Sequence, residues 1–142
     1  MDARVNVITL AVDDVDRARQ FYVDGLGWTP SVEVSGEVVF VPITPTLMLS
    51  LWRREAFEQE VGSAAAAGSS PIVLAHNVPT PEAVDDALEA AVRAGGSVLR
   101  PAEHREWGGY SGYLADVDGY RWEVAYNPGP LGVALMQGEG LA

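Results

Sequence analysis

The order of expected strands and helices occurs twice in this chain, and this internal repeat restricts the possible folds more than any other feature. In each half, a run rich in β-branched residues precedes an amphipathic helix pattern, and three further strand-like runs follow. The segments VITLAV (7–12) and VLAHNV (73–78) stand before the two helices in the same way. The repeat predicts an α+β fold made of two βαβββ modules.

Local signals set the expected limits of these elements. Asp13 and Asp14 offer an N-cap for the first helix, and Thr80 followed by Pro81 is a typical start for the second. Glycines end both helices. The strand-like runs cover 5–12, 28–34, 37–43 and 47–53 in the first half, and 72–78, 97–100, 109–115 and 120–126 in the second.

The repeat also divides the chain into segments. We expect the first module over residues 1–53 and the second over 71–127. Residues 54–70 are interpreted as a crossover linker, since their charged first part is compatible with a helix and residues 62–70 are almost entirely Gly, Ala and Ser. The glycine-rich tail, 128–142, is expected to be loose or to lie on a neighbour.

Composition excludes several classes of protein. Of 142 residues, 48% are hydrophobic, which supports a packed core. Nine basic residues against twenty acidic ones argue against nucleic-acid binding, which needs clustered Lys and Arg. The chain has no cysteine, and it has no apolar run long enough to cross a membrane. We therefore expect a cytoplasmic protein without membrane or nucleic-acid partners.

Two motifs within the repeat carry a family resemblance. The first is VDDVDRARQFY (12–22) followed by GLG (25–27), and the second is YLADVDGYRWEV (113–124). They are similar to the opening strand and helix and to the closing "DPDG…E" hairpin of the vicinal-oxygen-chelate superfamily, with Val117 where proline is usual. The resemblance, which covers about residues 5–127, implies two modules forming a cupped, partly open mixed sheet with helices outside, and usually a homodimer.

The resemblance also implies a test for a metal site. Metal-using members of the superfamily bring four ligands into the cup, and their positions correspond here to Val7, Ser50, Val73 and Glu123. Only Glu123 is a strong ligand, whereas a catalytic divalent ion generally needs about three protein ligands. We therefore expect no metal ion and no other cofactor.

Neither histidine is expected to replace the missing ligands. His76 is three residues beyond Val73, so alternation along a strand turns it toward the helices if Val73 faces the cup. His104 is expected in the loop 102–108, where a catalytic or ligand role is a weak candidate. Asp116 and Asp118 are better explained as turn residues than as calcium ligands.

The pairing of the closing hairpin predicts which side chains face the cup. A four-residue turn at 116–119 would place Leu114 opposite Arg121, Gly112 opposite Glu123 and Tyr110 opposite Ala125. The residues expected inside the cup are then Tyr110, Leu114, Arg121 and Glu123, together with Val7, Thr9, Val39, Val41, Met48, Ser50, Trp52, Val73, Ala75 and Asn77. Such an apolar, aromatic-edged pocket is typical of a small-molecule site.

Glu123 has two interpretations. It either forms a structural ion pair with Arg121, or it serves as a base or as the anchor of a cationic ligand. The loop 106–110 contains two glycines and could close over the cup, where Trp107 would offer a flat contact surface. A packing or dimer contact is the alternative for Trp107.

Three functions remain open at this point. The first is a binding protein that sequesters a small aromatic or cationic molecule without a metal. The second is a metal-free isomerase or lyase that acts on a carbonyl compound with Glu123, helped by His104 or Tyr110. The third is a metal-dependent glyoxalase- or dioxygenase-type enzyme with the non-standard ligands Glu123, His76 and His104.

Overall fold

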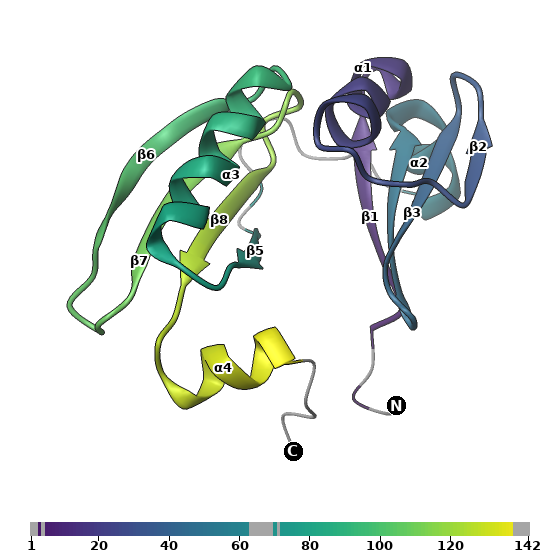
Figure 1. Cartoon of the computed structure of the whole chain (residues 1–142). Coiled ribbons are helices and arrows are strands. Elements are labelled where there is room, and N and C mark those ends of the chain that lie inside the picture. The colour runs from purple at the N-terminus through teal and green to yellow at the C-terminus, as the bar shows by residue number, and fades with distance from the viewer. Residues whose placement is uncertain (1–2, 4, 63–69, 71, 138–142) are drawn as a thin grey trace. The chain divides into compact units, whose positions relative to one another are not determined.

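A computed structural model describes residues 3, 5–62, 70 and 72–137, and the chain divides into two units, residues 1–68 and 69–142. Each unit contains an open, four-stranded mixed sheet, with the strand orders β1-β4-β3-β2 and β5-β8-β7-β6 (Figure 1). The two orders are equivalent, strand for strand. The predicted α+β fold of two βαβββ modules is therefore confirmed, while their assembly into a cup stays a prediction.

The first unit follows the expected order of elements. Its elements are β1 (Val7–Val12), α1 (Val15–Arg19), the π-helical segment η1 (Gln20–Gly25), β2 (Val32–Val34), β3 (Val38–Thr44) and β4 (Leu47–Arg53). The Asp14 side chain caps α1, since its Oδ1 accepts a hydrogen bond of 3.0 Å from the backbone N–H of Arg17. β1 pairs with β4 in parallel, and the other neighbours are antiparallel.

The core of the first unit lies between its sheet and α1. Leu49 and Leu51 of β4 are fully buried, and they pair with Val41 and Val39 of β3, so these four side chains share the face that α1 covers. The expectation that Val39 and Val41 share a face with Ser50 is wrong. Ser50 instead pairs with Phe40, because the register of β3 is shifted by one residue from the expected one.

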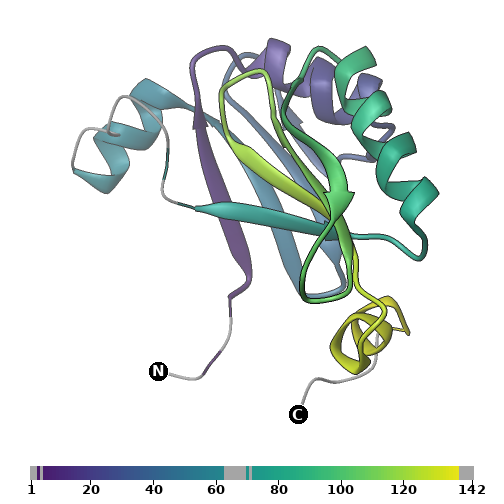
Figure 2. The ribbon, with the colours of Figure 1, turned by 90° about the vertical axis from the view of Figure 1, so that its left-hand side faces the viewer.

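The second unit repeats this arrangement around a longer helix. Its elements are β5 (Val73–Asn77), α3 (Pro81–Arg93), β6 (Ser97–His104), β7 (Tyr110–Ala115) and β8 (Arg121–Tyr126). Thr80 caps α3 by accepting a hydrogen bond from the N–H of Ala83 at 3.2 Å. The helix runs along one face of the sheet, against β6, β7 and β8 (Figures 1 and 2). Its buried residues Val84, Leu88 and Ala91 form the core together with Leu114 and Val124.

The turn between β7 and β8 is one residue shorter than expected. The N–H of Asp116 bonds to the carbonyl of Tyr120 at 2.9 Å, which leaves a three-residue loop, 117–119, with Gly119 at a φ of +88°. Asp116 is buried, and its Oδ1 accepts hydrogen bonds from the N–H groups of Asp118 and Tyr120 at 2.9 and 2.8 Å. As a result Tyr113, not Gly112, lies opposite Glu123, and the predicted hairpin register is wrong by one residue.

Asp116 therefore sets the register of the hairpin, and its removal should be costly. We expect Asp116→Ala to lower the free energy of unfolding by about 1–3 kcal/mol, because two backbone donors of the buried turn lose their acceptor. Asp116→Asn keeps that acceptor and should cost much less. Urea denaturation of both variants tests this, and equal losses for Ala and Asn would contradict the role of Oδ1.

Two further helices lie outside the repeat. α2 (Arg54–Val61) follows β4 directly, at the charged start of the expected linker, of which residues 63–69 lie outside the described part. α4 (Pro130–Gln137) occupies a region where a loose tail was expected. Pro130 stands at the first position of this helix, and Gly132 is buried against Asn127. Among the described residues, no helix is long and apolar enough to cross a membrane.

Candidate functional site

The second sheet has two chemically different faces. α3 covers one of them, which we call the α3 face. The other contains Glu123 and is called the Glu123 face. Register places Arg121, Glu123 and Ala125 of β8 on the Glu123 face with Val73, Ala75 and Asn77 of β5 and with Ser111, Tyr113 and Ala115 of β7. Asn77, Arg121 and Glu123 thus lie on one face, as the sequence led us to expect.

Glu123 is held by a tyrosine. The Tyr113 hydroxyl donates a hydrogen bond to Glu123 Oε1 at 3.0 Å, and both side chains are half-buried. Burial raises the pKa of Tyr113, the hydrogen bond and the negative charge of Glu123 raise it further, and Arg105 and Arg100 oppose the change. Tyr113 therefore remains a neutral donor at physiological pH, and the carboxylate keeps acceptor capacity for a second group.

Arg105, which follows β6 directly, lies beside this pair. Its guanidinium donates to Ser111 Oγ at 2.9 Å, to the Ser111 carbonyl at 2.8 Å and to Glu103 at 2.5 Å, and its side chain is only 12% exposed. The guanidinium carbon lies 5.8 Å from the centre of the Tyr113 ring. With Glu103 also accepting from Arg100, this network fixes a positive charge beside the ring of Tyr113.

Sequence reasoning missed three residues of this cluster, namely Arg105, Ser111 and Tyr113. The correct hairpin register could have found Ser111 and Tyr113, because it puts both on the same face as Glu123. It does not include Arg105. The expected ion pair of Glu123 with Arg121 is not what the side chains form within the described residues. Glu123 bonds to Tyr113, while Arg121 lies on the same face opposite Ala115.

Several residues that were expected beside Glu123 lie on the α3 face instead. Leu114 is buried opposite Trp122, and Tyr110 donates a hydrogen bond of 3.0 Å to Asp85 of α3. His104 is the last residue of β6, not part of a loop, and its ring lies 5.0 Å from that of Tyr110. The prediction that Tyr110 and Leu114 share a face with Glu123 is wrong, because the expected hairpin register differs by one residue from the observed one.

His76 lies where alternation predicted. It pairs with Val124 on the α3 face, and partial burial lowers its pKa, although part of its surface stays exposed. Glu123, His76 and His104, the alternative metal ligands, therefore do not lie around one point. The two histidines lie on the α3 face, and the carboxylate lies on the opposite face of the sheet.

Trp107 lies in the tight turn that joins β6 to β7. The turn is closed by hydrogen bonds of 2.9 Å from Arg105 N–H to the Gly109 carbonyl and from Gly108 N–H to the Arg105 carbonyl. The Trp107 ring packs on Gly109, where a Cβ would lie 1.8 Å from the ring, and the side chain is 54% exposed. A lid movement of Trp107 remains a prediction, as does its role in a contact.

The first sheet has an equivalent polar position at Ser50. Thr9 pairs with Ser50 just as Ala75 pairs with Glu123, so the register supports the correspondence between Ser50 and Glu123. Ser50 is almost completely buried. On the same face, Trp52 makes an edge-to-face contact with Phe57 of α2 at 6.2 Å between ring centres. A packing role for Trp52 therefore competes with its predicted role in ligand binding.

The residues present do not fit a divalent metal ion. The four positions expected to carry ligands hold two valines, a serine and Glu123, and valine has no donor atom. Among the residues that the structure describes, no group of three or more His, Asp or Glu side chains could hold a metal ion.

Comparison with known proteins identifies the family. The sequence matches the model of the Glyoxalase/Bleomycin resistance protein/Dioxygenase superfamily over residues 4–124. A glyoxalase-related enzyme from Fulvimarina pelagi is 37% identical over 89% of this chain and 90% of its own, with a TM-score of 0.84.

A lactoylglutathione lyase from Agrobacterium tumefaciens has the same fold at 21% identity, with a TM-score of 0.69 and coverage of 89% of this chain and 95% of its own. No functionally curated protein matches the sequence. Together with the repeated βαβββ topology, the family match over most of the chain shows that this protein belongs to the glyoxalase, bleomycin-resistance and dioxygenase superfamily.

Proposed function

We propose that this protein binds a small aromatic or cationic molecule on the Glu123 face, without a metal ion or other cofactor. The observation that carries the proposal is the hydrogen bond of 3.0 Å from the Tyr113 hydroxyl to Glu123. A carboxylate oriented by a neutral phenol is an anchor for one donor group of a ligand. The apolar residues Val73 and Ala75, which pair with the strand of Glu123, would contact the rest of the molecule.

The charges around this cluster favour a ligand that donates to Glu123. Arg105 already donates its hydrogen bonds to Glu103 and Ser111, so its guanidinium is not a partner of Glu123. Glu123 has only the neutral Tyr113 hydroxyl as its side-chain partner among the described residues. An ammonium or hydroxyl group of the ligand would therefore find its partner in Glu123.

A metal-free isomerase or lyase is the second candidate, and the same hydrogen bond favours it. Glu123 would take a proton from the carbon that carries the hydroxyl group of an α-hydroxycarbonyl compound, and the Tyr113 hydroxyl would turn its single hydrogen bond from Glu123 to the carbonyl oxygen. Glu123 would then return the proton to the former carbonyl carbon, while the proton of the substrate hydroxyl passes to the former carbonyl oxygen, so that the product is the isomeric hydroxycarbonyl compound. Tyr113 replaces His104 and Tyr110 as the partner in this reaction, since both of those lie on the α3 face.

The proposal includes a homodimer in the cytoplasm as the working form. Homodimers are usual in the superfamily that the sequence resembles, and the isolated chain exposes apolar residues such as Val7 and Val73. Sedimentation equilibrium should give a mass of twice the 15.1 kDa of the chain. A monomer at micromolar concentration would contradict this part of the proposal alone.

The function can be tested with two variants of the cluster. A thermal-shift screen of aromatic amines, aldehydes and antibiotics, with and without a chelator, would first supply a ligand. We expect Glu123→Gln to weaken that ligand at least about tenfold, or about 1.4 kcal/mol. Tyr113→Phe should weaken it less, because the carboxylate stays while its orienting donor is lost.

Glu82→Gln is the matched control, since Glu82 is exposed and lies in α3, on the other side of the sheet from Glu123. Unchanged affinity of Glu123→Gln, measured by calorimetry, would contradict the proposed site. Product formation in the same samples, lost in Glu123→Gln, would decide for the enzyme over the binding protein. A requirement for added metal would contradict both.

A further inference from the structure

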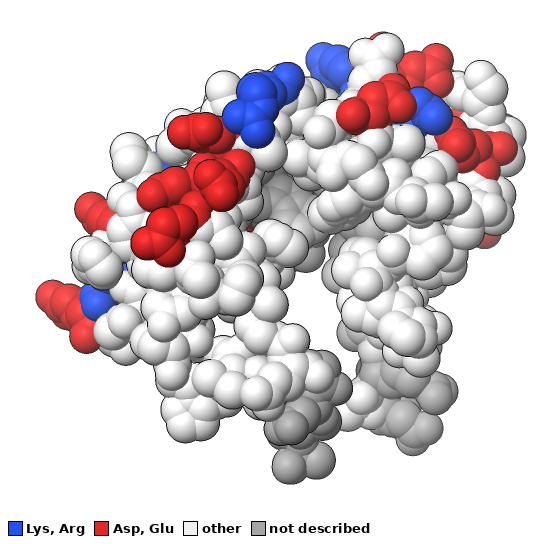
Figure 3. Space-filling model, viewed as in Figure 1, with Lys and Arg blue, Asp and Glu red and all other residues white. Residues whose placement is uncertain are grey.

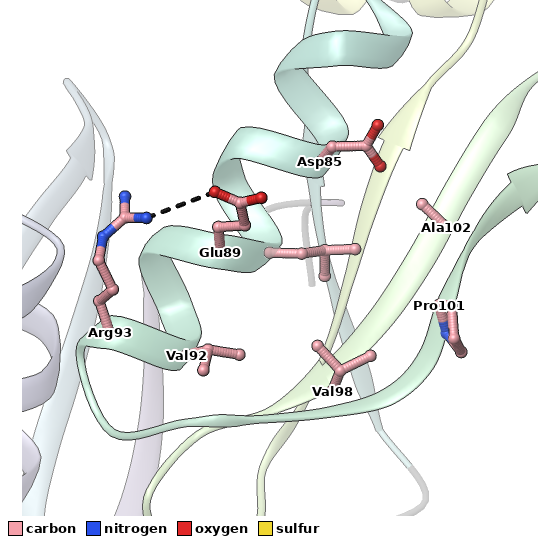
Figure 4. A pocket seen from close by; sticks show the side chains of 8 residues that line it. Asp85, Glu89, Val92, Arg93, Val98, Pro101 and Ala102 are labelled. Atoms are coloured by element: carbon pink, nitrogen blue, oxygen red, sulfur yellow. Dashed lines mark ion pairs between the residues drawn. The ribbon is translucent and has the colours of Figure 1, made fainter.

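A groove on the α3 face, opposite to Glu123, has no role in the function proposed above. It lies between α3 and β6 (Figure 4), is open to solvent and has a volume of about 550 Å³. Leu88 and Val92 line it from the helix and Val98 from the strand, and Val92 and Val98 are 48% and 41% exposed. The middle of the groove is therefore an apolar surface in contact with solvent.

The charged residues that line the groove make one end negative. Arg93 is paired with Glu89 at 3.5 Å, so these two charges compensate each other. Asp85 at the other end bonds to the Tyr110 hydroxyl, and burial together with the Asp85 hydrogen bond raises the pKa of Tyr110, which keeps this partner neutral. The negative charge of Asp85 thus remains uncompensated by a cation in the groove.

The surroundings strengthen the negative potential at this end. α3 also carries Glu82 and Asp86, both exposed, and acidic side chains gather over this helix in Figure 3. The whole chain has a formal net charge of −11. A groove that combines an apolar centre with an acidic end is complementary to a molecule with an apolar body and a positive group.

An extended peptide is a less suitable occupant than a compact molecule. β6 is an edge strand and could in principle pair with another strand. Its register is interrupted between Val98 and Arg100 and again between Arg100 and Glu103, and Pro101 lacks an N–H group. These features protect the edge against strand addition but leave the groove beside α3 open.

We infer that the groove between α3 and β6 binds an organic cation, with its apolar body on Leu88, Val92 and Val98 and its positive group at Asp85. This second site is independent of Glu123, because the two lie on opposite faces of the same sheet. A ligand in the groove would contact no residue of the Glu123 site, and a ligand at Glu123 would contact no residue of the groove.

Three probes with one apolar body test the inference, namely 4-phenylbutylamine, 4-phenylbutanol and 5-phenylvalerate. Titrations followed by ¹H–¹⁵N NMR should show saturable shifts of the Leu88, Val92 and Val98 amides with the amine. The alcohol should bind about two- to fivefold more weakly, which is the range of one exposed ion pair. The acid should bind more weakly still.

Asp85→Asn and Asp86→Asn form a matched pair, since they remove the same charge from adjacent positions of α3 and only Asp85 lines the groove. We expect Asp85→Asn to weaken the amine to the affinity of the alcohol, and Asp86→Asn to have a smaller effect. Equal effects of the two variants, equal binding of the three probes or an absence of shifts along the groove would overturn the inference.

Glu123→Gln separates this result from the proposed function. It should leave the amine shifts of Leu88, Val92 and Val98 unchanged. If the amine instead shifts residues around Glu123 and is lost in Glu123→Gln, the groove inference fails while the proposed function stands. If the amine shifts the groove residues while Glu123→Gln binds every ligand with unchanged affinity, the groove inference stands and the proposed function fails.

Discussion

Replacing Leu51 with alanine is expected to lower the free energy of unfolding by about 2–5 kcal/mol. Leu51 is fully buried in β4, between Leu10 of β1 and Val39 of β3 and beneath α1. The truncation removes apolar contacts and leaves a cavity that neighbouring strands cannot fill without losing their register. Since natural domains are stable by only about 5–15 kcal/mol, this is a large share of the total.

Urea denaturation followed by tryptophan fluorescence and circular dichroism measures the loss. Val34→Ala is the control, because Val34 lies in the edge strand β2 and is 46% exposed, so its truncation should change stability by less than about 0.5 kcal/mol. Equal losses for Leu51→Ala and Val34→Ala would show that the core of the first unit is not where the structure places it.

The second large effect is expected at Gly112. A Cβ at this position would lie 2.7 Å from Leu88 Cδ1 and 2.9 Å from the backbone nitrogen of Ala102. Leu88 can change its rotamer, but the backbone of β6 has to move as a whole. We expect Gly112→Val to destabilise the protein by about 1–3 kcal/mol or more, which is the usual cost of overpacking.

This variant also distinguishes the two possible registers of the β7–β8 hairpin. In the register expected from sequence, Gly112 would lie beside Glu123, and a larger side chain would block ligand binding without a large loss of stability. In the observed register, Gly112 pairs with Val124 on the α3 face. A stable Gly112→Val protein with impaired ligand binding would therefore support the register that the structure contradicts.

The overall fold could be predicted because its signals are long and repeated. Each βαβββ unit has a helix with a side-chain cap, at Asp14 and at Thr80, and strands with a regular hydrophobic pattern. Two copies of the same pattern support each other, so an uncertain strand in one half is identified by its equivalent in the other. β2 was nevertheless expected over 28–34 and is limited to Val32–Val34.

The site was harder to predict because it depends on single-residue registers. The Asp116 side chain and Gly119 stabilise a hairpin loop that is one residue shorter than expected. Tyr110 and Leu114 therefore lie on the α3 face and not, as predicted, beside Glu123. Glu123 could be singled out because a motif marks its position, and its role in ligand binding stays a prediction. Its partner Tyr113 depends on the turn, and Arg105, which lies near the Tyr113 ring, depends on the bulged strand β6. No local pattern marks either residue.

In both sheets the first strand pairs in parallel with the last, β1 with β4 and β5 with β8. During synthesis, β1 therefore cannot pair with β4 until the ribosome has released the chain as far as Arg53. Such distant pairings make folding slow compared with that of a helical bundle. The nascent β1, rich in valine and isoleucine, is then the segment most in need of protection from aggregation.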